Sequence, residues 1–353
     1  MPSLQAEQYM EKQTVSYLQS KRLVDNRLDD EHIRSWRERG FTLVHDLLPH
    51  PLLTTLKQDA LAFYPEPNTK AAERYNDFSS GQRFVFPSKS KAFNQITLHP
   101  ALLQAVADLL GVSVLELRLT QSDLWPKYGN DAPSDAGDNT DQRMHCDYPN
   151  HSLVHPPEWD HPEAVEMIIY LNSYDECEGA TAVVPRRGPN DPAYPWPITQ
   201  TPGVGDLDYV NDRQQAEVYM AENDPEAAAF RAEHLYPREA VANYRFGSVL
   251  LYRHDTWHRG RPVKPGTLRL VQNLTFTKSG REWLSPLHPG WSWSMYRRDK
   301  LMEKLIAQAT VAQRTVLGFP PPGHEYWSTR TLAAVEARYR AFGIDMTSYR
   351  EAL

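Results

Sequence analysis

The sequence has little cysteine and no long apolar run. Its 353 residues include two cysteines, Cys146 and Cys177. Two thiols cannot form a disulfide framework or complete a cysteine-based zinc site. No apolar stretch approaches the roughly 20 residues that span a bilayer, and no basic and apolar signal sequence is evident. These absences predict a cytoplasmic protein with reduced thiols that does not enter membranes.

Excess positive charge is also missing. Lysine and arginine number 38 against 45 acidic residues, which gives a formal net charge of -7. Proteins that bind nucleic acids normally present a basic face. We therefore expect no nucleic-acid partner and no docking on anionic membranes.

The pattern of apolar residues changes twice along the chain. Helical patterns with capping residues occur near residues 29–40, 50–64 and 99–111, and again after Arg281. Between them lie short strand-like runs such as AVEMIIYLNSY, GATAVVP, GSVLLY and TLRLVQNLTF. Because helices and strands do not alternate, a doubly wound parallel sheet is disfavoured. The pattern predicts a double-stranded β-helix, or jelly roll, wrapped by N- and C-terminal helices.

This organisation suggests a single domain with three parts. Residues 1–112 would form an N-terminal helical support, residues 113–281 the jelly-roll core, and residues 282–353 a C-terminal helical extension. A proline-rich stretch at about residues 190–245 interrupts the core. Long connections inside compact cores are often functional, so this insertion is either a lid or a tolerated surface loop.

The stretch RMHCDYPNH contains the first candidate site. Residues i and i+2 of an extended strand face the same way, so His145 and Asp147 would point together and Cys146 would point away. An imidazole and a carboxylate on one face supply two members of a 2-His-1-carboxylate metal site. A His-x-Asp pair taken alone is more typical of a polar strand edge than of a metal site.

A second stretch, RHDTWHRGRPV, lies between two apolar strands. It offers His254 and His258 as the missing ligand, and the following strand carries Arg269. A guanidinium group can bind a carboxylate through two parallel hydrogen bonds, as a 2-oxoacid beside a metal would require. Arg269 also belongs to a polar strand face, and periodicity does not distinguish a solvated face from a polar cavity.

The order and spacing of QSDLWPK, MHCD, IIYLNSYDECEGATAVVP and LLYRHDTWHRGRPV resemble the phytanoyl-CoA dioxygenase family of Fe(II)/2-oxoglutarate-dependent oxygenases. The resemblance implies that His145, Asp147 and His258 bind iron and form the catalytic centre. His258 is favoured over His254 because Arg-Gly-Arg-Pro follows it. The resemblance also implies that Arg269 holds the distal carboxylate of 2-oxoglutarate.

The same resemblance implies that Gln121 and Lys127 help to bind the co-substrate. The implied reaction uses Fe(II), 2-oxoglutarate and O2, hydroxylates a small molecule and releases succinate and CO2. Because Asp147 is intact, hydroxylation is favoured over halogenation. The alternatives are a zinc hydrolase with the same triad, which would leave Arg269 without a function, and a non-catalytic jelly-roll binding protein.

Two departures from the family pattern concern the substrate. Gly260 stands where some members have a serine that touches the co-substrate. Arg186 and Arg187 stand where Gly-Ser is frequent, and Arg259 and Arg261 flank the second motif. These four arginines either gather at a pocket mouth and favour an anionic substrate, or lie in solvent.

Overall fold

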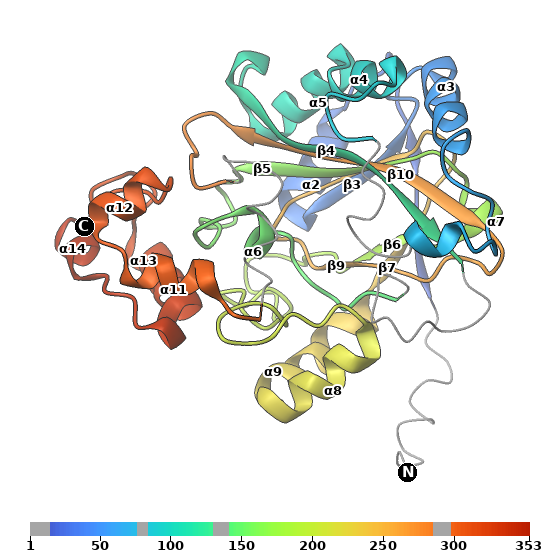
Figure 1. The fold of residues 1–353 in the computed structure, drawn as a ribbon. Coiled ribbons are helices and arrows are strands. Elements are labelled where there is room, and N and C mark those ends of the chain that lie inside the picture. Colours follow the sequence, from blue (N-terminus) through green and yellow to red (C-terminus); the bar gives the residue numbers. More distant parts are fainter. Residues whose placement is uncertain (1–14, 76–83, 130–140, 285–297) are drawn as a thin grey trace, which may run out of the picture.

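The computed structural model describes residues 15–75, 84–129, 141–284 and 298–353, and its centre consists of two β-sheets (Figure 1). One sheet has six strands in the order β2-β3-β8-β5-β10-β4, and the other has four in the order β1-β7-β6-β9. The pairs β2–β3 and β1–β7 are parallel, and the remaining pairs are antiparallel. The strand bounds are β1 Ser16–Gln19, β2 Lys21–Arg22, β3 Phe41–His45, β4 Leu117–Tyr128, β5 Ala164–Tyr170, β6 Thr181–Val183, β7 Ala240–Asn243, β8 Val249–Tyr252, β9 His258–Gly260 and β10 Leu268–Lys278.

The two sheets pack through an apolar layer. Leu43, Leu250 and Val271 of the large sheet share one buried cluster with Ala182 and Val241 of the small sheet. Every second side chain along these strands points away from this layer, because successive residues of a strand face opposite sides of the sheet. The predicted jelly-roll core with flanking helices is confirmed.

Four N-terminal helices cover the outer face of the six-stranded sheet, at the top and centre of Figure 1. They are α2 Asp30–Arg39, α3 His50–Leu61, α4 Lys91–Thr97 and α5 Pro100–Leu110. Leu56 and Val106 from these helices join Met167, Leu251 and Leu270 from the sheet in the largest buried cluster. Burying each such side chain contributes about 1.5–3 kcal/mol.

The end of α2 supports a loop of the core. The helix begins after Asp29, whose carboxylate accepts the His32 amide, and ends at Gly40 in the left-handed region with φ 93°. The Gly40 carbonyl accepts the Arg253 amide at 3.0 Å and the Thr256 hydroxyl at 2.8 Å. Both donors lie in the 253–257 loop between β8 and β9, so α2 holds that loop in place.

The expected insertion at about residues 190–245 contains both helices and a core strand. Its helices α8 Arg213–Asn223 and α9 Pro225–Phe230 lie below the four-stranded sheet in Figure 1. Near its end, β7 pairs with β6. The stretch therefore contributes a strand to the core as well as covering it.

The C-terminal helices gather at one side of the sheets (Figure 1). They are α11 Leu301–Gln308, α12 Val311–Val316, α13 Thr329–Tyr339 and α14 Thr347–Glu351. Phe319, Val335 and Tyr349 of this region form a buried cluster with Leu153 and Val154.

The two short core helices are α6 Tyr148–His151 and α7 Tyr174–Cys177. Among the described helices, none combines the length and apolarity that crossing a bilayer requires.

Gly40→Ala should destabilise the fold by about 2–4 kcal/mol, because it combines left-handed strain with a clash. A Cβ at Gly40 would lie 2.5 Å from the Thr256 hydroxyl. Gly343 also ends a helix with positive φ but has nothing within 4 Å of its Cβ position, so Gly343→Ala is the matched control for strain alone. Denaturant unfolding should show the larger loss in Gly40→Ala. Equal losses would mean that the contact with Thr256 is unimportant.

Candidate metal centre

Two distant segments meet through a pair of backbone hydrogen bonds. The His145 amide donates to the His258 carbonyl at 2.9 Å, and the His258 amide donates to the His145 carbonyl at 2.8 Å. This isolated bridge replaces the regular strand expected for the His-x-Asp motif. Asp147 already has helical dihedrals, because the chain turns into α6 and Pro149 has no amide with which to continue a ladder.

His145 and Asp147 still point to the same side. Cys146 lies between them, buried, with its thiol directed at the Asp255 carbonyl. One ligand atom from each of His145, Asp147 and His258 lies within 4.8 Å of the other two. The His145 Nε2–Asp147 Oδ1 distance is 3.5 Å and the His258 Nε2–Asp147 Oδ2 distance is 3.4 Å. Metal–ligand bonds of about 2.0–2.2 Å suit this spacing.

Backbone carbonyls fix both imidazole rings. His145 Nδ1 lies 3.0 Å from the Arg143 carbonyl, and His258 Nδ1 lies 3.0 Å from the Thr256 carbonyl. Since a carbonyl only accepts, each Nδ1 carries the proton and each Nε2 keeps a lone pair for a metal. The donor set is therefore oriented for metal binding.

The local electrostatics favour the protonation states that a metal needs. Burial lowers the pKa of His145 to about 4, so this imidazole is neutral at physiological pH. Burial by itself would raise the pKa of Asp147, but His258 and His145 outweigh it and hold that pKa below its ordinary range. A neutral imidazole beside a carboxylate is the form that binds a divalent cation.

Two further residues lie near the carboxylate of Asp147, and one of them, Tyr252, supports it. The Tyr252 hydroxyl at the end of β8 donates to Asp147 Oδ2 at 2.9 Å, and its ring lies 4.7 Å from that of His258. Glu166 pairs with Tyr252 across β5 and β8 and accepts a hydrogen bond from Thr275. Burial, and then Asp147, raises the pKa of Glu166 well above its usual range. Sequence reasoning missed both, although a carboxylate inside the apolar run AVEMIIY was a readable signal.

The triad opens into a cavity of about 120 Å³ that Arg269 also lines. Arg269 is 7% exposed, and Nη1 donates to the Gly179 carbonyl. Its Nε is buried without a hydrogen-bond partner among the described residues. Asn273 and Thr275 of the same strand face line this cavity too. The polar face of β10 therefore faces the cavity and not the solvent.

Gln121 and Lys127 of β4 differ in position. Gln121 lies in the cavity wall, where its amide donates to Asp123 at 3.1 Å. Lys127 is buried outside the wall formed by the described residues, and its ammonium group donates to the Arg261 carbonyl at 2.8 Å. Gly260 is also in the wall, and a Cβ there would lie 2.4 Å from Gln142 Oε1. Gln142 thus occupies the space where some family members have a serine side chain.

His254 and the arginine cluster lie elsewhere. His254 is buried but outside the group of convergent ligand atoms found in the described chain.

Arg259 is also buried and forms ion pairs with Glu239 and Asp141. The idea that Arg186, Arg187, Arg259 and Arg261 gather at one pocket mouth is therefore wrong, because carboxylates hold Arg259 away from the other pair.

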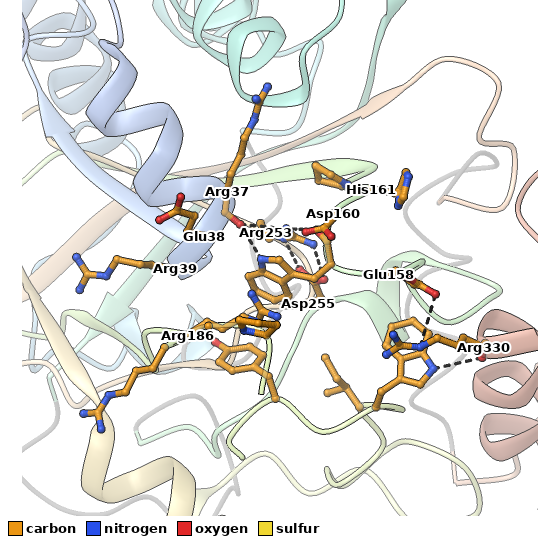
Figure 2. A pocket seen from close by; sticks show the side chains of 18 of the residues that line it. Arg37, Glu38, Arg39, Glu158, Asp160, His161, Arg186, Arg253, Asp255 and Arg330 are labelled. Atoms are coloured by element: carbon orange, nitrogen blue, oxygen red, sulfur yellow. Dashed lines mark hydrogen bonds and ion pairs between the residues drawn. The ribbon is translucent and has the colours of Figure 1, made fainter. Parts of the chain in front are cut away.

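Arg186 and Arg187 line a separate cleft of about 1060 Å³ (Figure 2). Arg186 and Arg253 both stack on Trp159, and Arg253 forms a bidentate pair with Asp255. The cleft shares no lining residue with the metal cavity in the described structure. The 253–257 loop separates the two, with Arg253 and Asp255 in the cleft and the flanking Tyr252 and His258 in the cavity.

Comparison with known proteins places the chain in a family. The sequence pattern of phytanoyl-CoA dioxygenase (PhyH) matches residues 36–270, and the chain belongs to this family. No curated protein matches the sequence.

Several solved structures are similar to this one at low sequence identity. SnoK, a non-heme alpha-ketoglutarate-dependent carbocyclase from nogalamycin biosynthesis, is 14% identical over 74% of this chain and 89% of its own, with a TM-score of 0.48. EvdO2 from Micromonospora carbonacea var. aurantiaca is 13% identical over 73% of this chain and 97% of its own, with a TM-score of 0.47. The epimerase SnoN, solved with Fe3+, alpha-ketoglutarate and nogalamycin RO, is 14% identical over 71% and 83%, with a TM-score of 0.46.

Replacing His145, Asp147 or His258 with Ala should remove one of three ligands and abolish stoichiometric binding of Fe(II). His254→Ala should keep the metal, because His254 lies outside the convergent group. Metal content after anaerobic loading and desalting measures both outcomes. If His254→Ala loses the metal while His258→Ala retains it, the assignment of the second histidine is wrong.

Tyr252→Phe should lower metal affinity about 10- to 100-fold, the usual effect of removing a hydrogen bond that orients a ligand. The ring and its packing on His258 remain, so only the hydroxyl bond to Asp147 is lost. A competition titration with a chelator provides the measurement. Tyr219→Phe is a control, since its hydroxyl bonds only the Asp208 amide at 2.7 Å among the described residues. An unchanged affinity in Tyr252→Phe would show that Asp147 needs no support.

Proposed function

We propose that this protein is an Fe(II)/2-oxoglutarate-dependent oxygenase that hydroxylates a small molecule. One observation carries the proposal: two imidazole Nε2 atoms and a carboxylate converge in a cavity that Arg269 also lines, and the buried Nε of Arg269 has no partner among the described residues. A 2-His-1-carboxylate set with open positions is typical of non-heme Fe(II) oxygenases. Membership of the phytanoyl-CoA dioxygenase family supports the same class.

Each residue of the site has a separate task in this proposal. His145, Asp147 and His258 would hold the metal, and a 2-His-1-carboxylate set of this kind leaves positions for co-substrate and oxygen. When bound, iron with 2-oxoglutarate supplies the activation of O2, with succinate and CO2 as products. Tyr252 fixes the orientation of Asp147, and the buried walls exclude water from the reacting groups.

Arg269 is suited to hold the distal carboxylate of 2-oxoglutarate. Gly179 anchors one end of its guanidinium group, and the unpartnered Nε needs an acceptor. A buried donor without a partner costs about 1–3 kcal/mol, and a carboxylate would remove this cost. Gln121 lies in the same wall and would add a weaker contact. Lys127 lies outside the cavity wall formed by the described residues, and one of its three N–H donors bonds the Arg261 carbonyl, so its contact with the co-substrate stays a prediction.

Arg269→Ala should leave Fe(II) bound and weaken 2-oxoglutarate binding by about 2–5 kcal/mol, because a buried charge pair is lost. Arg269→Lys should recover only part of this, since an ammonium group lacks the planar fork. Gln121→Ala should have a smaller effect, and Arg118→Ala, on the exposed part of the same sheet, should have none.

Calorimetry with the metal-loaded protein measures 2-oxoglutarate affinity, and succinate release measures turnover. A zinc hydrolase or a non-catalytic binding protein would release no succinate with any metal. Unchanged 2-oxoglutarate affinity in Arg269→Ala would contradict the assignment of that residue. Absence of 2-oxoglutarate binding to the wild-type protein would contradict the proposed function itself.

A further inference from the structure

The wall of the metal cavity contains two neighbouring polar side chains whose roles are unassigned. Asn150 and His151 of α6 are each 8% exposed and line the cavity together with the triad. Asn150 Oδ1 and His151 Nδ1 are buried, and neither has a hydrogen-bond partner among the described residues. Buried polar atoms in folded proteins nearly always have a partner, so this pair needs an explanation.

Contacts from distant parts of the chain fix the backbone of helix α6. Arg338 of α13 donates to the carbonyls of Pro149, Ser152 and Val154 at 2.9, 2.7 and 3.1 Å. Arg338 itself is 2% exposed. The Tyr148 hydroxyl at the start of α6 is bonded to the carbonyl of Ile198. Such fixed, unsatisfied groups are characteristic of preorganised binding sites.

The chemistry of the atoms limits what can bind them. A carboxamide oxygen only accepts, so Asn150 Oδ1 requires a donor from the ligand. A neutral imidazole presents one accepting and one donating nitrogen. Asn273 Oδ1, across the cavity on β10, is another buried acceptor without a partner in the described chain. A carboxylate or a hydrocarbon chain cannot satisfy this set, whereas a hydroxyl group or an amine can.

We propose that Asn150 and His151 form the substrate subsite, and that they hydrogen-bond a hydroxyl or amino group close to the oxidised carbon. This rests on the proposed oxygenase function and narrows its substrate to small, polyhydroxylated or aminated molecules. A site that hydrogen-bonds such a group discriminates strongly against analogues without it, because its own buried atoms then stay unpaired.

Matched pairs of probes test the subsite directly. Glycerol, serinol and myo-inositol are each compared with their O-methylated counterparts, using ligand-observed NMR on protein loaded with Zn(II) and 2-oxoglutarate. The wild-type protein should bind each hydroxylated probe at least tenfold more tightly than its methylated partner. In Asn150→Leu and His151→Phe this ratio should fall below about twofold, while 2-oxoglutarate affinity stays unchanged.

The controls use the same substitutions at exposed positions. Asn190→Leu and His161→Phe lie outside the cavity wall and should keep the wild-type ratio. Asn150→Leu should also keep the thermal midpoint, because it replaces an unpaired buried polar group with an apolar one of similar size. His151→Gln retains a hydrogen-bonding group and should restore part of the discrimination.

The outcomes separate the two proposals. If the wild-type protein binds both members of each pair alike, or neither member, the subsite is overturned. If the variants discriminate as well as wild type, ordered water satisfies Asn150 and His151 and the subsite is again overturned. If 2-oxoglutarate does not bind, the oxygenase function fails, and the probe pairs measured with metal alone still decide the subsite.

Discussion

The site depends on the pair of backbone hydrogen bonds between His145 and His258. They bring the His-x-Asp segment against the first residue of β9 and set the two imidazole rings 4.4 Å apart between centroids. His258 belongs to β9, which pairs with β6, whereas His145 lies outside the regular strands, so the position of His145 depends on this bridge. The surrounding packing must therefore hold the bridge, and each layer of the fold contributes to this.

Support for the bridge comes from opposite ends of the chain. Gly40, at the end of α2, accepts hydrogen bonds from the loop that leads to His258. Arg338, in α13, donates hydrogen bonds to three backbone carbonyls of the segment that follows Asp147. Since α13 lies beyond the 36–270 family match, this second support belongs to the part of the chain that the family pattern does not cover.

The cavity combines satisfied and unsatisfied polar groups in a consistent way. Atoms that orient the metal ligands are bonded, as in the Nδ1 atoms of His145 and His258 and the hydroxyl of Tyr252. Other buried atoms of residues that line the cavity, among them Arg269 Nε and Asn150 Oδ1, lack partners in the described structure. Unpaired buried groups lower stability by about 1–3 kcal/mol each, and sites that bind ligands commonly retain this strain.

Local sequence patterns were sufficient to predict the types of the main elements and the residues able to bind a metal. Asp29 and Gly40 delimit α2 as their capping preferences indicate, and the alternation in TLRLVQNLTF identifies β10. The His-x-Asp spacing was enough to place His145 and Asp147 on one side, even without a regular strand, because neighbouring side chains in extended backbone alternate.

Which face of each element lines the cavity depends on long-range packing, and local patterns do not predict it. Periodicity gives Arg269 and Asn273 a common face but not its environment, which depends on the sheet packed opposite. The same limit applies to Arg259, whose partners Glu239 and Asp141 lie on other segments, and to Glu166 and Tyr252, which meet across two strands. The spacing of residues along one element predicts which side chains share a face. Their burial and their hydrogen-bond or ion-pair partners depend on contacts between residues far apart in the chain.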